Sequence, residues 1–164
     1  MKILALGSNL PYKNHSPENI INLAYEFLLK KKIKILKKSH IYLSEAYPNK
    51  NDPKFCNSVI SIETDLKPID LLDKILEVEK EFGRVREIKN SPRTLDIDII
   101  CYNDLIINEK EITIPHPSLH KRAFVLLPLR DIDENWRHPV HLKTILQFIK
   151  EFNTNELNKV KKII

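Results

Sequence analysis

The spacing of apolar residues predicts two amphipathic helices in the first half of the chain. Apolar side chains recur every three or four positions over residues 17–32 and again over residues 68–82, which is the period of an α-helix. Ser16 precedes Pro17, a pairing typical of a helix N-cap, and Gly83 stands where a C-cap glycine belongs. Two further helical stretches are expected nearer the C-terminus, over residues 117–129 and 141–152.

Shorter apolar stretches between these helices are typical of β-strands. They cover residues 3–6, 33–46, 55–66 and 94–101, and a short hairpin pairs residues 105–107 with residues 112–114. The resulting order of strand, helix, strand, strand, helix, strand (βαββαβ) is the ferredoxin-like split pattern. We therefore expect an α+β fold with a ferredoxin-like core, an extra hairpin, C-terminal helices and a frayed tail.

Length and glycine content narrow the range of functions. The chain has 164 residues without repeats or linkers, which suits a single domain spanning residues 1–164. It contains two glycines, Gly7 and Gly83, too few for a Walker A loop or a dinucleotide fingerprint. If the protein handles a nucleotide, side chains and metal ions must do most of the binding.

The cysteine content and the hydrophobicity of the chain indicate in which cellular compartment the protein is expected. Cys56 and Cys101 stand far apart without a CxxC motif, so reduced and buried thiols are expected. No apolar run approaches the roughly 18 residues of a membrane span, and the N-terminus turns polar too soon for a signal peptide. We expect a cytoplasmic monomer with no membrane partner.

The distribution of positive charge points to phosphate. The net charge is +5, and the lysines are spread widely, including a run over residues 30–38 that is typical of a solvated face. Arginines instead cluster, with Arg84, Arg86 and Arg93 inside ten positions. Arginine suits planar, bidentate phosphate contacts. Surface pairing with Glu81 or Glu87 is the alternative, but such pairs contribute little, and the position beside the aspartates favours a function.

A pair of aspartates follows this arginine cluster. Asp96 and Asp98 alternate with apolar residues, so a strand would point both carboxylates to one face, with Cα atoms roughly 6.5–7 Å apart. Such close carboxylates repel unless a positive group lies between them. The pattern fits one or two Mg²⁺ ions that also hold substrate phosphates, with a merely solvated strand face as the alternative.

Two further segments offer groups for a flat ligand. Phe55 and Asn57 share a strand face and combine an aromatic plane with an amide, although ordinary strand packing would also explain them. Downstream, His116 lies between two prolines, and Arg122 and Phe124 add a cation and a second ring. Among the six histidines we find no zinc-ligand spacing.

Glu79 lies at the edge of the apolar stripe of its predicted helix. An acid that is partly buried there needs a partner, while an edge position that reaches water is equally consistent with the pattern.

Taken together, these segments resemble the 6-hydroxymethyl-7,8-dihydropterin pyrophosphokinase family of folate biosynthesis. The matching stretches are ALGSNL at residues 5–10, FCN at 55–57, GRVR at 83–86, PRTLDID at 92–98, IPHP at 114–117 and RAFVLLPL at 122–129. They cover residues 2 to about 140 in order, and PRTLDID with IPHP is the most specific part. The chain departs from many members by having Lys89-Asn90-Ser91 where a loop tryptophan is common.

The resemblance implies a three-layer α/β/α sandwich and an activity. The terminal diphosphate of ATP would pass to the pterin hydroxymethyl group by attack on the β-phosphorus, releasing AMP. ATP and 6-hydroxymethyl-7,8-dihydropterin would be the ligands, with two Mg²⁺ ions and no nucleic acid.

The resemblance also implies residue roles. Asp96 and Asp98 match metal ligands, and Arg84 and Arg93 match catalytic arginines. The pterin-binding positions are Ser44, Glu45, Ala46, Phe55, Asn57 and Phe124. The ATP-binding positions are Glu79, Arg84, Arg93, His116 and Arg122.

Two other functions fit parts of the sequence. The basic balance and the lysine run would suit a ferredoxin-like nucleic-acid-binding module, but a central aspartate pair repels phosphate unless metal is present. A nucleotidyltransferase would use Gly7-Ser8 with the aspartates, yet that chemistry places the two motifs close together, and here nearly ninety residues separate them.

Overall fold

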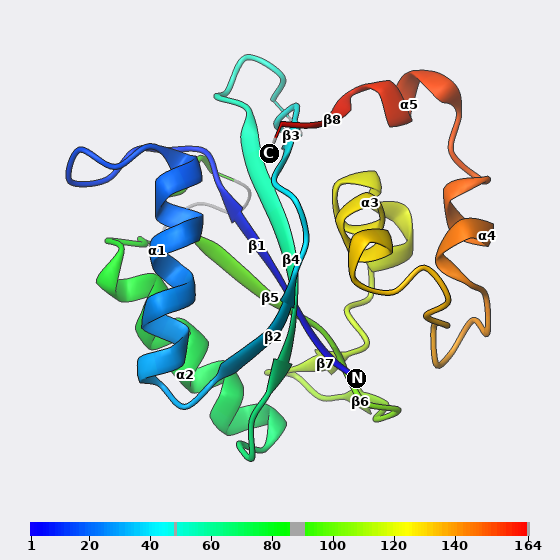
Figure 1. Ribbon diagram of the computed structural model, residues 1–164, viewed down its shortest axis with the longest axis horizontal. Coiled ribbons are helices and arrows are strands. Elements are labelled where there is room, and N and C mark those ends of the chain that lie inside the picture. Colours follow the sequence, from blue (N-terminus) through cyan, green and yellow to red (C-terminus); the bar gives the residue numbers. More distant parts are fainter. Residues whose placement is uncertain (48, 86–90, 164) are drawn as a thin grey trace.

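The computed structural model describes residues 1–47, 49–85 and 91–163, and its centre is a six-stranded antiparallel sheet (Figure 1). The strands are β1 (Lys2–Ser8), β2 (Lys34–Lys38), β3 (Tyr42–Ser44), β4 (Phe55–Glu63), β5 (Asp96–Tyr102) and β8 (Val160–Lys162). Their order is β5-β1-β4-β3-β8, and β2 also pairs with β4. This topology confirms the predicted ferredoxin-like α+β class.

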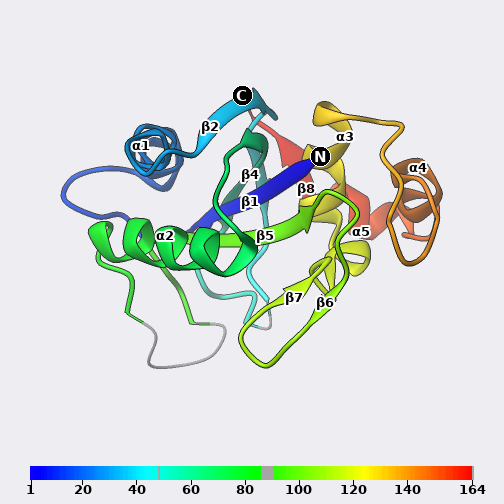
Figure 2. The ribbon, with the colours of Figure 1, turned by 90° about the horizontal axis from the view of Figure 1, so that it is seen from below.

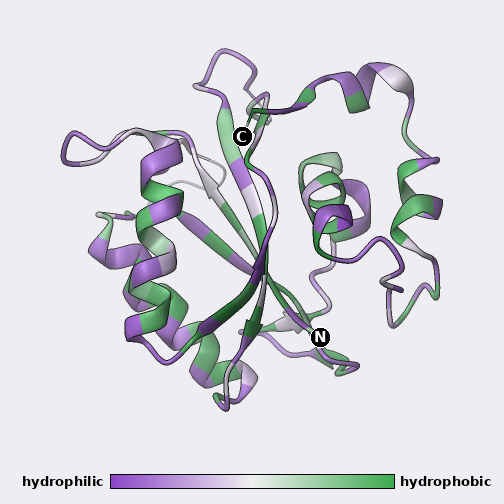
Figure 3. Cartoon of the chain, in the orientation of Figure 1, coloured by the Kyte–Doolittle hydropathy of each residue, from purple (hydrophilic) through white to green (hydrophobic). Residues whose placement is uncertain are grey.

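Helices cover both faces of the sheet, which gives the three expected layers (Figures 1 and 2). α1 (Pro17–Lys30) and α2 (Pro68–Glu81) lie on one face, and α3 (Ala123–Ile132) and α4 (Ile145–Ile149) lie on the other. Two separate clusters of buried apolar side chains join these layers, one on each face of the sheet. Hydrophobic residues run through the central strands, while the peripheral loops are mostly hydrophilic (Figure 3).

The N-cap of α1 and the glycine after α2 are both present, as the sequence predicted. Ser16 accepts a hydrogen bond from the Asn19 amide at 3.3 Å, which caps α1, and Pro17 occupies its first turn. Gly83 follows α2 with a φ of +70°, a left-handed conformation that glycine adopts without penalty. The hairpin is also present, as β6 (Ile107–Asn108) and β7 (Thr113–Ile114).

The prediction of one continuous strand over residues 33–46 is wrong, because Ser39 interrupts it. The Ser39 hydroxyl accepts the amide hydrogen of Val59 at 2.9 Å, where a strand backbone carbonyl would otherwise pair. The register of β2 against β4 has already shifted between Ile35 and Lys37. Two short strands, β2 and β3, therefore pair with β4 in place of one long strand.

The C-terminal predictions also need correction. The tail does not fray: it forms α5 (Thr154–Asn158) and then β8, which pairs with the outer edge of β3. The helix expected over residues 141–152 is limited to α4, which begins at a capping box of Thr144 and Gln147. The stretch from residue 117 divides into a 3-10 turn, η1 (Leu119–Lys121), and α3.

Both cysteines are buried and unpaired, as predicted. Burial raises the pKa of the Cys101 thiol to about 12. Within the described residues, no helix has the length and apolar character needed to cross a bilayer.

Candidate active site

A cleft of about 1090 Å³ opens on the sheet face that also carries α3. The ends of β1, β3, β4 and β5 form its floor, and the segment from His116 to Val125 and the C-terminal residues 156–160 form its walls. Alternation along β5 explains the position of the acids. Leu95 and Ile97 are buried against α1 and α2, so Asp96 and Asp98 face the opposite side, into the cleft.

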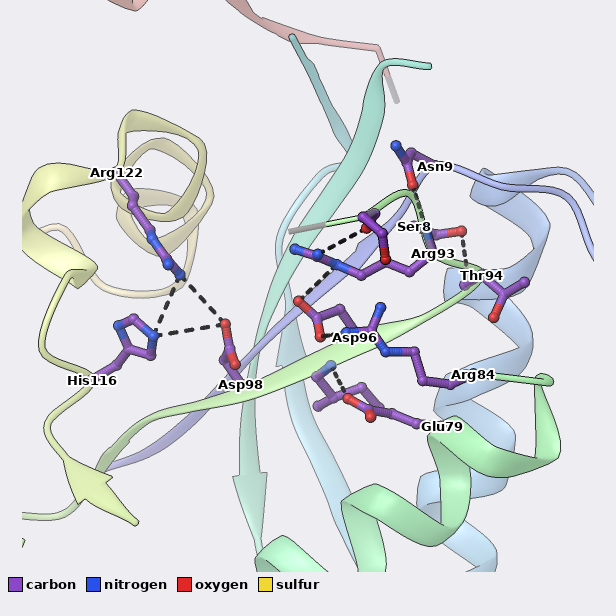
Figure 4. A network of polar contacts seen from close by, with 12 residues as sticks. Ser8, Asn9, Glu79, Arg84, Arg93, Thr94, Asp96, Asp98, His116 and Arg122 are labelled. Atoms are coloured by element: carbon purple, nitrogen blue, oxygen red, sulfur yellow. Dashed lines mark hydrogen bonds and ion pairs between the residues drawn. The ribbon is translucent and has the colours of Figure 1, made fainter. Parts of the chain in front are cut away.

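Asp96 lies between two arginines at the bottom of the cleft (Figure 4). Its carboxylate oxygens are 3.1 Å from Nη2 of Arg84 and 3.1 Å from Nε of Arg93. The three side chains are only 11–20% exposed, so water screens these ion pairs less than it would at the surface. Two of the clustered arginines are thereby held at the Asp96 carboxylate.

Asp98 has looser partners on the other side of the cleft. Its Oδ2 lies 3.5 Å from Nη1 of Arg122 and 3.9 Å from Nε2 of His116 (Figure 4). Desolvation and the neighbouring Asp96 charge raise the pKa of the Asp98 carboxyl, while His116 and Arg122 act in the opposite direction. A carboxylate with weak protein contacts and a like-charged neighbour is well placed to take a cation.

The loop after β1 holds the arginine segment in place. The amides of Asn9 and Leu10 both donate to the Arg93 carbonyl, at 3.0 and 3.1 Å, and Asn9 Oδ1 accepts the Arg93 amide at 2.7 Å. Ser8 donates to the Thr94 carbonyl at 2.5 Å. Reasoning from individual residues did not predict these hydrogen bonds. Ser8, Asn9 and Leu10, which make them, lie in the ALGSNL stretch that contributed to the family resemblance.

Glu79 is buried and binds the backbone of β5. Its side chain is 1% exposed and accepts the Ile97 amide at 2.8 Å. That amide points away from β1, at the edge of the sheet, where no second strand pairs with β5 within the described part of the chain. Glu79 is not among the residues that line the cleft, and in this position it supports the strand that carries the aspartates. Its predicted contact with ATP stays a prediction.

The other end of the cleft is aromatic and amide-rich. Phe55, Asn57 and Phe124 line it together with residues 44–46. Three acceptors engage the Asn57 side-chain amide nitrogen Nδ2: the Tyr42 carbonyl at 3.2 Å, the Ser44 hydroxyl at 3.0 Å and the Phe55 carbonyl at 3.2 Å. This network orients the amide so that its Oδ1 atom remains as the acceptor.

The ionic and aromatic ends meet at two cation–π contacts. The guanidinium carbon of Arg93 lies 5.0 Å from the Phe55 ring centre, and that of Arg122 lies 5.8 Å from the Phe124 ring centre. A ligand lying across the cleft would therefore touch an aromatic ring and an arginine at each of these points.

The structure brings nearly all the predicted residues into this one cleft. The exceptions are Glu79, described above, and Arg86, which lies outside the described residues together with Lys89 and Asn90 of the unusual loop. The cleft also contains side chains that the sequence did not single out: Tyr47, Lys50, Lys121, Glu156, Lys159 and Val160. Lys159 contacts Glu45 at 3.8 Å, so the C-terminal strand closes the wall beside the aromatic end.

Replacing Gly83 with alanine is expected to lower the free energy of unfolding by about 1–3 kcal/mol. The left-handed backbone disfavours any side chain there, and a Cβ atom would lie 2.5 Å from Cε2 of Tyr12. Gly7→Ala is the matched control, because the nearest atom that its Cβ would meet among the described residues is Cδ1 of Phe55 at 3.7 Å. Urea unfolding of both variants tests this, and equal stabilities would contradict it.

Fold and cleft together define a class of protein: a ferredoxin-like α/β/α sandwich whose sheet presents paired carboxylates and clustered arginines for phosphate chemistry. Known proteins narrow this class. The family model for 7,8-dihydro-6-hydroxymethylpterin-pyrophosphokinase (HPPK) matches residues 3–134. The chain belongs to this family.

Individual relatives agree with this assignment. The 2-amino-4-hydroxy-6-hydroxymethyldihydropteridine pyrophosphokinase of Aquifex aeolicus is 40% identical over 148 residues, covering 90% of this chain and 89% of that protein. The folic acid synthesis protein FOL1 of Dictyostelium discoideum is 44% identical over 142 residues, covering 86% of this chain. The chain spans only 21% of the length of that larger protein.

A solved structure supports the fold. The crystal structure of wild-type HPPK-DHPS from Plasmodium falciparum superposes with a TM-score of 0.74 at 17% identity, covering 99% of this chain and 48% of that one. At this level of identity the similarity shows the architecture alone.

Proposed function

We propose that the protein transfers a diphosphate group from ATP to 6-hydroxymethyl-7,8-dihydropterin, a step of folate biosynthesis. The pterin hydroxyl oxygen attacks the β-phosphorus, the bond between the α-phosphate and the β-phosphorus breaks, and AMP leaves. The products are the pterin diphosphate and AMP. Family membership and the charge arrangement of the cleft support this proposal.

The observation that carries the proposal is the pair of carboxylates facing one cleft with three arginines around them. Asp96 and Asp98 contact Arg84, Arg93 and Arg122 at 3.1–3.5 Å. A triphosphate needs cations along its length, and a metal ion needs anionic oxygens, so this set suits a metal–polyphosphate complex. When ATP and metal bind, the arginines would exchange their ion pairs with the aspartates for contacts with phosphate, and the aspartates would bind the metal.

Magnesium fits the donor set. Asp96 and Asp98 offer hard oxygen ligands on a rigid strand, and both line the cleft. We infer that they would hold two Mg²⁺ ions. Bound there, the ions would neutralise phosphate charge and lower the pKa of the substrate hydroxyl.

The arginines and His116 would hold the phosphate chain. Arg84 and Arg93 approach from the Asp96 side, and Arg122 with His116 approach from the Asp98 side. Cations on both sides of the aspartates can keep the chain aligned for in-line attack and stabilise charge as it develops on the transferring group. We assign Glu79 as a positioning residue for β5.

The aromatic end would take the pterin. The amide nitrogen Nδ2 of Asn57 is already engaged, so the Oδ1 atom of Asn57 is the group that can accept from a pterin ring N–H. Phe55 and Phe124 would contact the ring, and the backbone of residues 44–46 would bind its other edge. The pterin would then occupy the aromatic end of the cleft, and the triphosphate of ATP would occupy the end with the aspartates and arginines.

The competing nucleic-acid-binding function is less consistent with this structure. A module that reads bases on a ferredoxin-like sheet needs that face open, and here α3 packs on it. The part of the face left accessible carries two aspartates, which oppose a phosphate backbone.

We further propose that residues 1–164 act as one domain and that the protein is a cytoplasmic monomer.

The reaction product provides the direct test. Protein incubated with Mg-ATP and 6-hydroxymethyl-7,8-dihydropterin is expected to form AMP and pterin diphosphate in equal amounts, measured by chromatography and ³¹P NMR. A control without pterin should form no AMP. Formation of ADP would contradict the proposal, because ADP signals transfer of a single phosphoryl group.

A further inference from the structure

Three histidines come together outside the active-site cleft, beside the base of α4. His120 belongs to η1, and His138 and His141 belong to the connection between α3 and α4. One side-chain nitrogen of each lies within 4.8 Å of those of the other two. The sequence showed no zinc spacing because 18 positions separate His120 from His138.

We propose that His120, His138 and His141 form a binding site for a divalent transition metal of the zinc type. Imidazole nitrogens suit Zn²⁺, Co²⁺ and Ni²⁺, whereas Mg²⁺ prefers oxygen. Three nitrogens around zinc at 2.0–2.1 Å would lie roughly 3.3 Å apart. The rings therefore need to approach by at most about 1.5 Å from their present separation, which small side-chain rotations supply.

The surroundings hold the three rings close together. The ring centroid of His141 lies 4.5 Å from those of both His120 and His138, and all three rings contact Phe148 of α4. His120 Nδ1 is shielded from solvent and has no hydrogen-bond partner among the described residues. A buried nitrogen without a partner is unfavourable, and a metal–nitrogen bond would satisfy a ring nitrogen here.

Two existing hydrogen bonds to His138 weaken the site. The Nδ1 atom of His138 accepts the amides of Val140 and His141 at 3.1 and 3.2 Å, so the neutral ring carries its proton on Nε2. Ligation through Nε2 moves that proton to Nδ1 and exchanges these two contacts for one metal–nitrogen bond. A metal–nitrogen bond has to outweigh these two neutral hydrogen bonds, so we expect His138 to be the weakest of the three ligands.

A fourth position is open to solvent. His120 and His141 also line a hollow of about 490 Å³ that contains Lys121, Lys143, Glu151 and Glu156. Water or the Glu151 carboxylate, now paired with Lys143, could complete a tetrahedral site. The two lysines oppose a cation, and the two glutamates offset them.

A metal here would brace one wall of the active-site cleft. It would tie η1 to the connection before α4, and Lys121 and Arg122, which follow His120 directly, line the cleft. The site is therefore structural in character, and its existence does not depend on the proposed diphosphate transfer.

The test measures metal binding to the full chain without a histidine tag. Calorimetry with Zn²⁺ in excess Mg²⁺, which occupies the oxygen ligands, is expected to give one zinc per chain. At about 100 times Kd, zinc should raise Tm by roughly 5–10 °C. Co²⁺ in its place should show the visible absorption of tetrahedral nitrogen coordination.

His141→Gln is the informative variant, because His141 is exposed and its loss should leave the fold intact. It should weaken zinc binding at least about tenfold and remove the rise in Tm. His15→Gln, at an exposed position far from the cluster in sequence, is the matched control and should bind as the wild type does. Equal zinc binding by these two variants, or an octahedral Co²⁺ spectrum, would overturn the proposal.

Discussion

Replacing Asp98 with asparagine is expected to lower magnesium-dependent diphosphate transfer by at least about a thousandfold while the fold survives. Asparagine keeps the shape of the side chain but removes its charge, and a neutral amide is a poor ligand for Mg²⁺. The structural loss is small, because Asp98 is 39% exposed on its side chain and its contacts with Arg122 and His116 measure 3.5 and 3.9 Å. Initial rates of AMP formation at saturating ATP give the effect, and Tm reports on the fold.

Asp104→Asn makes the same chemical change on the exposed turn after β5 and should leave the rate unaltered. The corresponding Asp96 variant is less informative, because it would leave Arg84 and Arg93 without the carboxylate they share. Turnover by Asp98→Asn within about tenfold of the wild type would refute the role assigned to Asp98.

Arg93→Ala is expected to lower kcat by roughly a hundredfold to a thousandfold and to change KM for ATP by less than about fivefold. Its guanidinium is held 3.1 Å from Asp96 and 5.0 Å from the Phe55 ring centre, so it is in place before substrates bind. A preorganised cation beside the transferring phosphate gains most where negative charge develops, which is in the transition state. Steady-state kinetics with varied ATP at saturating pterin measure both constants.

Arg93→Lys separates charge from geometry. Lysine keeps the positive charge but loses the planar fork, so it should recover only part of the lost kcat. If Arg93→Ala raises KM for ATP and leaves kcat unchanged, Arg93 binds ATP equally well in the ground state and the transition state, and its catalytic role is wrong.

Local signals in the sequence were sufficient for the core of the fold. The helical period, Ser16 ahead of Pro17 and the glycine after α2 act within a few residues, so they can be read without knowing the packing. The alternation around Asp96 and Asp98 likewise predicts that the carboxylates share a face, because a strand has a period of two. Glu79 shows the limit of such reasoning: its position on the helix indicated a partner, but the Ile97 amide could be identified only in the folded sheet.

Amino-acid order by itself thus determined the two helices, the sheet pattern and the face on which the acids lie, because these depend on periodicity and on neighbours along the chain. Tertiary structure alone decided that the Ser39 hydroxyl ends β2, that the tail adds β8 to the sheet, and that His120 meets His138 and His141. These outcomes depend on which distant backbone groups are left to pair and which side chains packing brings together. A linear pattern does not contain that information, because the partners are far apart in sequence.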